Sequence, residues 1–283
     1  MPNTTSNTTE LTAEQVQTML VQPVEATSVF LAAGPTIFDT NGSPVRVPVA
    51  PATEADALSW VGESEVIPEV DHDFSEISLL PSTMKSIKTI TRFSRELSRQ
   101  SIVALDAVLQ GRMVKDVAAR FDAQFLSDKG DGIVTPRGLF AQTASQDVTA
   151  GAALTLDSVL DGLGVALGNH VSTEGLTLFV RSEDYLDLRR EADGNGHSLI
   201  QPDATKGLFS PVLGTKVVIS DRIPAGRAAL VDMKSIAVAR DVFPDVTILD
   251  QTFGTTDEIG LRVVSRADLG VLDPAGLVTF TIA

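Results

Sequence analysis

One stretch of this chain, residues 94–126, restricts its fold more than any other. Apolar residues recur there at steps of three and four, the spacing that lines one face of an α-helix. Ser94 is placed to cap the start, and the turn-forming run at 127–132 predicts the end. About 32 residues would make a rod on the order of 48 Å long, which needs something packed along its whole length. The apolar stripe consists of Leu97, Ile102, Leu105, Leu109, Met113, Val117, Phe121 and Phe125.

Charge is distributed unevenly along the chain. The net charge is −15 over 283 residues, with −11 carried by residues 1–84 and +5 by residues 85–120. An acidic arm and a basic rod in one chain predict that copies attract each other. The acidic total also predicts weak and nonspecific contact with DNA, because duplex affinity comes largely from lysine and arginine that neutralise phosphates.

The sequence offers little material for an enzyme, a cofactor site or a metal site. It has no cysteine and only three histidines, and no phosphate-binding, dinucleotide-binding, hydrolase or zinc-protease motif is present. Asp71, His72 and Asp73 do not converge on a metal, because neighbouring strand residues point to opposite faces; a solvated hairpin tip is the favoured interpretation. No apolar run approaches the roughly 20 residues that span a bilayer, and the N-terminus lacks a secretory signal. No membrane partner is expected.

The remaining pattern mixes helices and strands without a regular βαβ alternation, which favours the α+β class. An extended, proline-punctuated arm over 21–50 must lie on another body, because it cannot bury enough surface alone. A β-hairpin is predicted with an outgoing strand at 58–61 and a return strand over 77–93. Further helices are predicted at 12–20, at 154–167 and from Ser182, with a polar linker before the second; strands are predicted at 176–180, 216–220, 228–231, 236–239, 246–249, 259–265 and 277–282.

Six short stretches of sequence, none of them specific alone, are informative when they are taken together and in order. They are WVGESE at 60–65, ITRFSREL at 90–97, the stretch from FL at 125–126 to GL at 138–139, LFVRS at 178–182, LGTKVVIS at 213–220 and ALVD at 229–232. With these runs the chain resembles the major capsid proteins of tailed bacteriophages, which have the Hong Kong 97-type fold. The resemblance covers about residues 50–283.

The resemblance implies a fold with five segments and a structural role. The expected segments are an N-terminal arm (1–50), an E-loop β-hairpin (51–92), a P-domain with the spine helix (93–143), an A-domain (144–254) and P-domain return strands (255–283). The implied protein self-assembles into hexamers and pentamers of an icosahedral shell around the double-stranded DNA of a tailed phage, without catalytic turnover. It would be assembled in the host bacterial cytoplasm and reside in the virion capsid.

Some features of the family are expected to differ here. Only about 50 residues precede the E-loop, so a separate scaffold protein is expected, together with a portal; a decoration protein is left open. A lysine–asparagine weld between subunits is not expected, because Ile67 precedes the E-loop proline and no asparagine follows Asn195. Two alternatives remain at this point: an encapsulin-type bacterial compartment, and a metal-dependent hydrolase that uses the acidic hairpin.

Two hypotheses concern particular residues. The acidic E-loop of one copy, with Glu63, Glu65 and Glu69, is expected to dock on a basic region of its neighbour that comprises Lys85, Lys88, Arg92, Arg95 and Arg99. Gly111 interrupts the helix pattern, which costs roughly 0.5–1 kcal/mol relative to alanine. It is expected either to allow close packing or to act as a hinge when a precursor shell expands.

Overall fold

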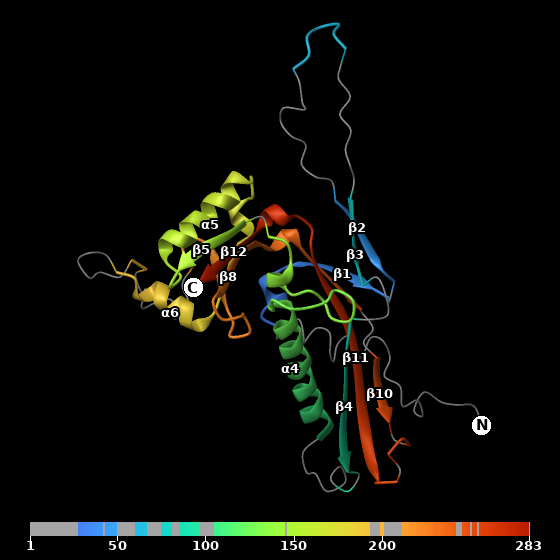
Figure 1. Ribbon diagram of the computed structural model, residues 1–283. Coiled ribbons are helices and arrows are strands. Elements are labelled where there is room, and N and C mark those ends of the chain that lie inside the picture. Colours follow the sequence, from blue (N-terminus) through green and yellow to red (C-terminus); the bar gives the residue numbers. More distant parts are fainter. Residues whose placement is uncertain are drawn as a thin grey trace.

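The fold consists of two five-stranded sheets, a projecting two-stranded hairpin and three α-helices within the described part of the chain (Figure 1). The computed structural model describes residues 28–41, 43–49, 60–66, 75–80, 85–94, 96, 105–144, 146–192, 199–200, 211–241, 245–249, 251–253 and 255–282. The helix predicted at 12–20 lies outside these residues. Short 3₁₀ turns occur at Leu31–Ala33, Leu139–Ala141, Thr173–Gly175, Met233–Ser235 and Pro274–Gly276.

The first sheet is built around one long strand, β11 (Glu258–Val271). Strand β4 (Ser86–Ser94) and strand β10 (Asp245–Leu249) both pair with the first part of β11 and therefore lie on opposite edges of it. Strand β9 (Ile236–Asp241) pairs with the last part of β11. Strand β1 (Thr36–Thr40) adds to β9 in parallel, so the arm predicted to need another body lies on this sheet.

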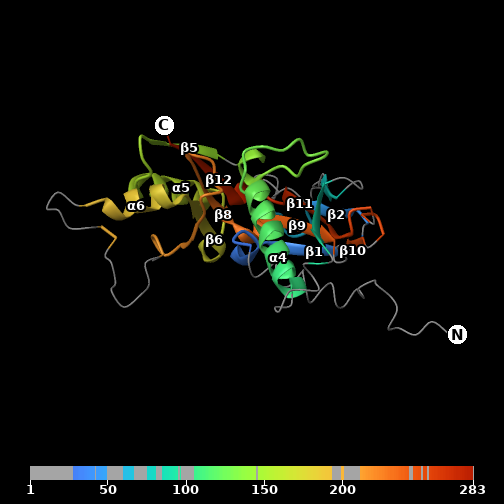
Figure 2. The same cartoon turned by 90° about the horizontal axis from the view of Figure 1, so that it is seen from below.

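Helix α4 (Leu105–Phe125) runs along one side of this sheet (Figures 1 and 2). The second half of the predicted stripe, from Met113 to Phe125, is buried and shares one core with Val263, Ala267 and Leu269 of β11. Ser94 is the last residue of β4, and its hydroxyl accepts a hydrogen bond from the amide of helical Glu96 at 3.1 Å. Residues 97–104 lie outside the described residues, so one continuous rod from 94 stays a prediction. The buried residues of α4 are Met113, Val114, Val117, Ala118, Phe121 and Phe125.

A buried carboxylate on α4 holds the arm. Asp122 accepts hydrogen bonds from the Ser28 hydroxyl at 2.6 Å, the Val29 amide at 3.0 Å and the Phe30 amide at 3.1 Å. The Phe30 ring lies 5.5 Å from that of Phe125, centroid to centroid. The arm is therefore fixed to the helix by both charge-assisted hydrogen bonds and aromatic packing.

The second sheet has the strand order β5-β12-β8-β6-β7 and is covered by helix α5 (Leu156–Gly168), with α6 (Ser182–Arg190) beside it. Both helices agree with the sequence prediction, and Thr155 caps α5 through a capping box. Gly162 lets α5 approach the Phe280 ring, since a Cβ there would collide with it. The strands are β5 (Gln146–Gly151), β12 (Leu277–Ile282), β8 (Arg227–Asp232), β6 (Leu176–Val180) and β7 (Lys216–Ile219).

The strand pairing crosses the segment boundary expected near residue 254. Strands β9 and β10, expected in segment 144–254, pair with β11, whereas β12, expected with the other body, lies between β5 and β8. Strand β5 was predicted as a polar linker. Its residues at 146, 147, 149 and 151 are polar or glycine and mostly exposed, because β5 is an edge strand.

The projecting hairpin pairs strand β2 (Val45–Val49) with strand β3 (Ser75–Leu79). The outgoing strand predicted at 58–61 is not found at Trp60 and Val61, which lie outside any strand; residues 58–59 are outside the described residues. The alternating valines of β2 supply the apolar face instead, and Val45 packs with Leu79 beside the first sheet. The return strand predicted over 77–93 is two strands in the structure. Strand β3 pairs with β2 in the hairpin, whereas β4 pairs with β11 and turns its apolar side to α4.

Candidate inter-subunit surface

The tip of the projecting loop, residues 60–66, is the part of the described chain that extends farthest from the two sheets (Figure 1). A turn closes it: the Glu65 amide donates to the Gly62 carbonyl at 3.3 Å, and a Glu65 carboxylate oxygen accepts from the Gly62 amide at 3.0 Å. Glu63 and Glu65 are exposed. Trp60 is fully exposed, and Val66 is 91% exposed. The tip thus presents acidic and apolar side chains together to the surroundings.

The base of the loop is held rigidly on β11. Leu79 packs against the backbone at Gly270, where a Cβ would come within 2.6 Å of the leucine side chain. The Leu80 amide donates to Asp268 at 2.9 Å. Asp268 also forms a buried ion pair with Lys85, Nζ to Oδ2 2.5 Å. These contacts fix where the projecting loop leaves the molecule.

This ion pair corrects the expectation for Lys85. Its side chain is only 8% exposed and is neutralised within its own chain, so it does not contribute to a basic surface. The sequence placed it in a basic stretch, but the charge of a stretch does not show which side chains are buried. Glu69, Arg95 and Arg99 lie outside the described residues, and their role stays a prediction.

Lys88 and Arg92 lie together on an exposed face of β4. They alternate with Thr89 and Thr91, so both project from the same side of the strand. Ile90 lies between them and is 51% exposed. The Arg92 guanidinium lies 4.1 Å from the centroid of the Phe253 ring, a cation–π contact that restrains this side chain. The face combines positive charge with apolar area.

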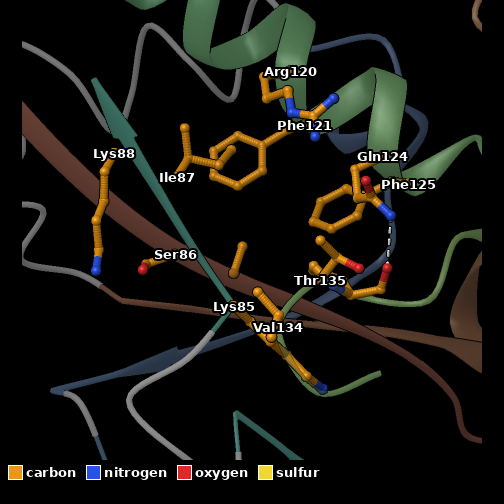
Figure 3. Close-up of a pocket in the computed structure, with 12 residues that line it drawn as sticks. Lys85, Ser86, Ile87, Lys88, Arg120, Phe121, Gln124, Phe125, Val134 and Thr135 are labelled. Carbon is orange, nitrogen blue, oxygen red and sulfur yellow. Dashed lines mark hydrogen bonds between the residues drawn. The ribbon is translucent and has the colours of Figure 1, made fainter. Parts of the chain in front are cut away.

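A cavity of about 230 Å³ lies between β4, α4 and the loop that follows α4 (Figure 3). Phe121, Phe125 and Ile87 give it apolar walls, and Lys88 and Arg120 place positive charge beside it. Val134 contributes from the loop (Figure 3). This cavity was not predicted, because it forms only where three separated segments meet. The lining residues are Lys85, Ser86, Ile87, Lys88, Arg120, Phe121, Gln124, Phe125, Val134, Thr135, Pro136 and Ala267.

The loop after α4 is held in shape by a single carboxylate. Asp131 accepts hydrogen bonds from the amides of Ile133, Val134 and Thr135 at 2.8–2.9 Å. These bonds, led by the one from Thr135, favour the ionised form and lower the pKa of Asp131 from 3.8 to about 2. The loop is tied to the sheet, because the Val134 carbonyl accepts from the Lys85 amide at 3.1 Å. Asp131 was not singled out in the sequence, although its place between two glycines signals a turn.

Gly111 lies within α4, as expected, and the choice between close packing and a hinge stays a prediction. Arg112 on the same helix pairs with Asp116 at 3.1 Å, an exposed i, i+4 contact. Among the described residues, no group of three or more His, Asp or Glu side chains is placed to hold a metal ion. The described helices include none long and apolar enough to cross a membrane.

Comparisons with known proteins agree on one fold. The model of the phage capsid family matches residues 10–282. Solved structures similar to this chain include the capsid of a native GTA particle (TM-score 0.75, 16% identity, 90% of each chain covered) and a Mycobacterium phage Bobi protein (TM-score 0.68, 19% identity, 90% of each covered). A Microbacterium phage Oxtober96 protein gives a TM-score of 0.71 at 12% identity, covering 90% of this chain and 91% of that one. No curated protein matches.

Proposed function

Because this chain belongs to the phage capsid family and is a major capsid protein that forms a viral shell, we propose that its copies are joined by a charged contact. In this contact the acidic loop tip of one copy, residues 60–66, docks on the basic face of β4 in its neighbour, with Lys88 and Arg92. The contact would operate within hexamers and pentamers of an icosahedral shell that encloses double-stranded DNA.

The observation that carries this proposal is the direction of the loop. The tip lies far from β4 of its own chain (Figure 1), so Glu63 and the exposed Lys88 can meet only between different copies. Each exposed pair is worth only about 0.2–1 kcal/mol. A closed shell, however, repeats the contact at every subunit. Such repeated weak charge pairs determine the register and the choice of partner more than they raise the affinity.

A charge exchange tests the contact. Glu63 is the suitable position at the tip, because Glu65 also closes the turn. We expect Glu63→Lys to reduce the yield of closed shells strongly, because it places like charges opposite each other, and the double variant Glu63→Lys with Lys88→Glu to restore much of it. The yield is measured by sedimentation and electron microscopy of particles formed at low and moderate salt.

Asp161→Lys on the exposed surface of α5 is the matched control, because it makes the same change of net charge away from the loop tip. It should leave the shell yield near that of the wild type. Normal shells from Glu63→Lys at moderate salt would overturn the charged contact. Failure of the double variant to improve on Glu63→Lys would show that Lys88 is not the partner.

Other partners follow from the family and the charge. We infer a portal and a separate scaffold protein as partners during assembly in the host bacterial cytoplasm. The overall charge of −15 supports only weak, nonspecific contact between the inner surface and packaged DNA. The same reasoning gives the protein a structural role without catalytic turnover.

A further inference from the structure

Trp60 is the single tryptophan of the chain, and it stands fully exposed at the loop tip. Val66, at the other end of the same tip, is also almost fully exposed. A large aromatic side chain in water forgoes the stabilisation that its burial would give. Tryptophan is among the residues most enriched where the binding energy of protein interfaces is concentrated. The position of Trp60 therefore indicates a contact in which it is buried.

The cavity between α4, β4 and the loop after α4 has the size and lining for one such side chain. Its volume of about 230 Å³ is below the roughly 300–1,000 Å³ of typical small-molecule sites. A cavity of about 150 Å³ already accepts benzene, so an indole fits the space. Phe121 and Phe125 offer the aromatic surfaces against which an indole ring packs favourably (Figure 3).

Polar groups at the cavity match the rest of the tip. Arg120 and Lys88 are exposed beside it, and neither forms an ion pair with any described residue; Glu63 would bring the complementary charge. A buried indole N–H also needs an acceptor. Gln124 lines the cavity, and its amide nitrogen is held by the Pro136 carbonyl at 2.7 Å, which leaves its side-chain oxygen to accept from an indole.

We propose that Trp60 of one copy inserts into this cavity of a second copy. Its own cavity is out of reach, because the loop tip extends away from α4 (Figure 1). The proposal rests on the charged contact proposed above in that the same tip approaches the same strand near Lys88, which borders the cavity although its side chain leaves β4 on the face opposite Ile87 (Figure 3). It adds an apolar anchor to the charged contact, and the anchor provides most of the affinity.

The single tryptophan makes its own burial measurable. Its fluorescence and its quenching by acrylamide are compared in dissociated subunits and in purified shells of the wild-type chain. We expect a water-like, readily quenched emission in subunits, and a blue-shifted emission with several-fold weaker quenching in shells. Trp60 that is quenched as readily in shells as in subunits would overturn the insertion.

Variants of two neighbouring residues, Val134 and Ile133, form a matched pair that tests whether Trp60 is buried in this cavity. Val134 lines the cavity and is 59% exposed, whereas Ile133 is 64% exposed and does not line it. The amides of both are held by Asp131 at 2.9 Å, so the two substitutions perturb the loop alike. Val134→Glu places an acid where the indole enters and should either prevent assembly of folded subunits or abolish the protection of Trp60. Ile133→Glu should do neither.

Shells of Val134→Glu that protect Trp60 as the wild type does would show that the indole is buried elsewhere. Should Val134→Glu misfold, engineered cysteines decide, since the chain has none of its own. Val61→Cys with Val134→Cys should form disulfides between chains in shells, and Val61→Cys with Leu186→Cys on α6 should not. Absence of the first link would overturn the proposal.

The two proposals fail in different ways. Glu63→Lys shells that form and still protect Trp60 would refute the charged contact and support the insertion. If the double variant Glu63→Lys with Lys88→Glu restores shells in which Trp60 is fully quenchable, the charged contact is supported and the insertion is refuted.

Discussion

Asp268 accepts hydrogen bonds from groups in separate parts of the chain: the Leu80 amide at the base of the projecting loop, the Lys85 ammonium before β4, and the Leu269 amide on β11. Both partners of its ion pair are buried, with 2% of the Asp268 side chain exposed. A buried pair adds little compared with apolar residues of the same shape, but the loss of one partner leaves an uncompensated charge. Single substitutions here are therefore costly.

We expect Asp268→Ala to lower the free energy of unfolding by about 3–5 kcal/mol, because the Lys85 ammonium is left unpaired in the interior. Urea unfolding of dissociated subunits measures the change. Asp187→Ala, which removes the exposed pair with Arg190, is the control and should cost less than about 1 kcal/mol. Equal losses in the two variants would contradict the importance of burial at Asp268.

The pKa of Asp131 predicts a pH dependence at the loop beside the cavity. The folded pKa is about 2 against an ordinary value of 3.8. The folded state therefore gains stability from ionised Asp131 above about pH 4, and this gain is lost as the pH falls from about 4 to about 2. The loss concerns the loop that carries Val134.

Asp131→Asn removes this titration while it keeps a side-chain oxygen that can accept from the loop amides. We expect the variant to be less stable than the wild type at pH 6 and the difference to shrink as the pH approaches 2. Unfolding midpoints of dissociated subunits, measured for both proteins across this range, check the prediction. A difference that stays constant with pH would show that the charge of Asp131 does not stabilise the loop.

At the scale of elements, helix α4 connects the arm, the first sheet and the cavity. Its C-terminal half is fixed by Asp122 and by aromatic packing of Phe121 and Phe125. Gly111 lies in the half nearer its start. A helix that is held at one end and carries a glycine toward the other has a natural place to bend, because glycine weakens the helix locally.

We expect Gly111→Ala to permit assembly of a precursor shell but to slow or block its expansion, because alanine stiffens the helix at this point. Particle diameters followed by light scattering and electron microscopy after an expansion trigger give the measurement. Gly164→Ala is the control, since a Cβ at that helical glycine of α5 meets nothing within 4 Å. Expansion of Gly111→Ala shells at the wild-type rate would exclude the hinge.

Elements with local signals could be predicted, and pairings between distant segments could not. Helix α5 is marked by its apolar spacing and by Gly168–Asn169 at its end, helix α6 by acids in its first turn and arginines in its last, and β12 by a short apolar run. Which strand accompanies β3 depends on packing against the first sheet, so the outgoing strand was misplaced. Lys85 was misassigned for a related reason: its partner, Asp268, lies 183 residues away.

At the scale of the whole molecule, the base of the projecting loop and the surface proposed to receive a neighbour's loop share β11. Asp268 and Gly270 hold the base near one end of this strand. Residues 258–266 support β4 and its basic face toward the other end. The capsid contact would thus enter and leave each subunit through the same backbone element.

The length of β11 gives this arrangement a mechanical consequence. Fourteen residues at about 3.3 Å each make a beam of about 46 Å, braced by β4 and β10 along one part and by β9 along the other. If the proposed contact holds, a pull on one subunit's loop would travel along this beam to the place where the next loop is seated. Around a closed ring of subunits such beams would carry tension in series, so that pressure from inside a finished shell would load hydrogen-bonded strands along their length.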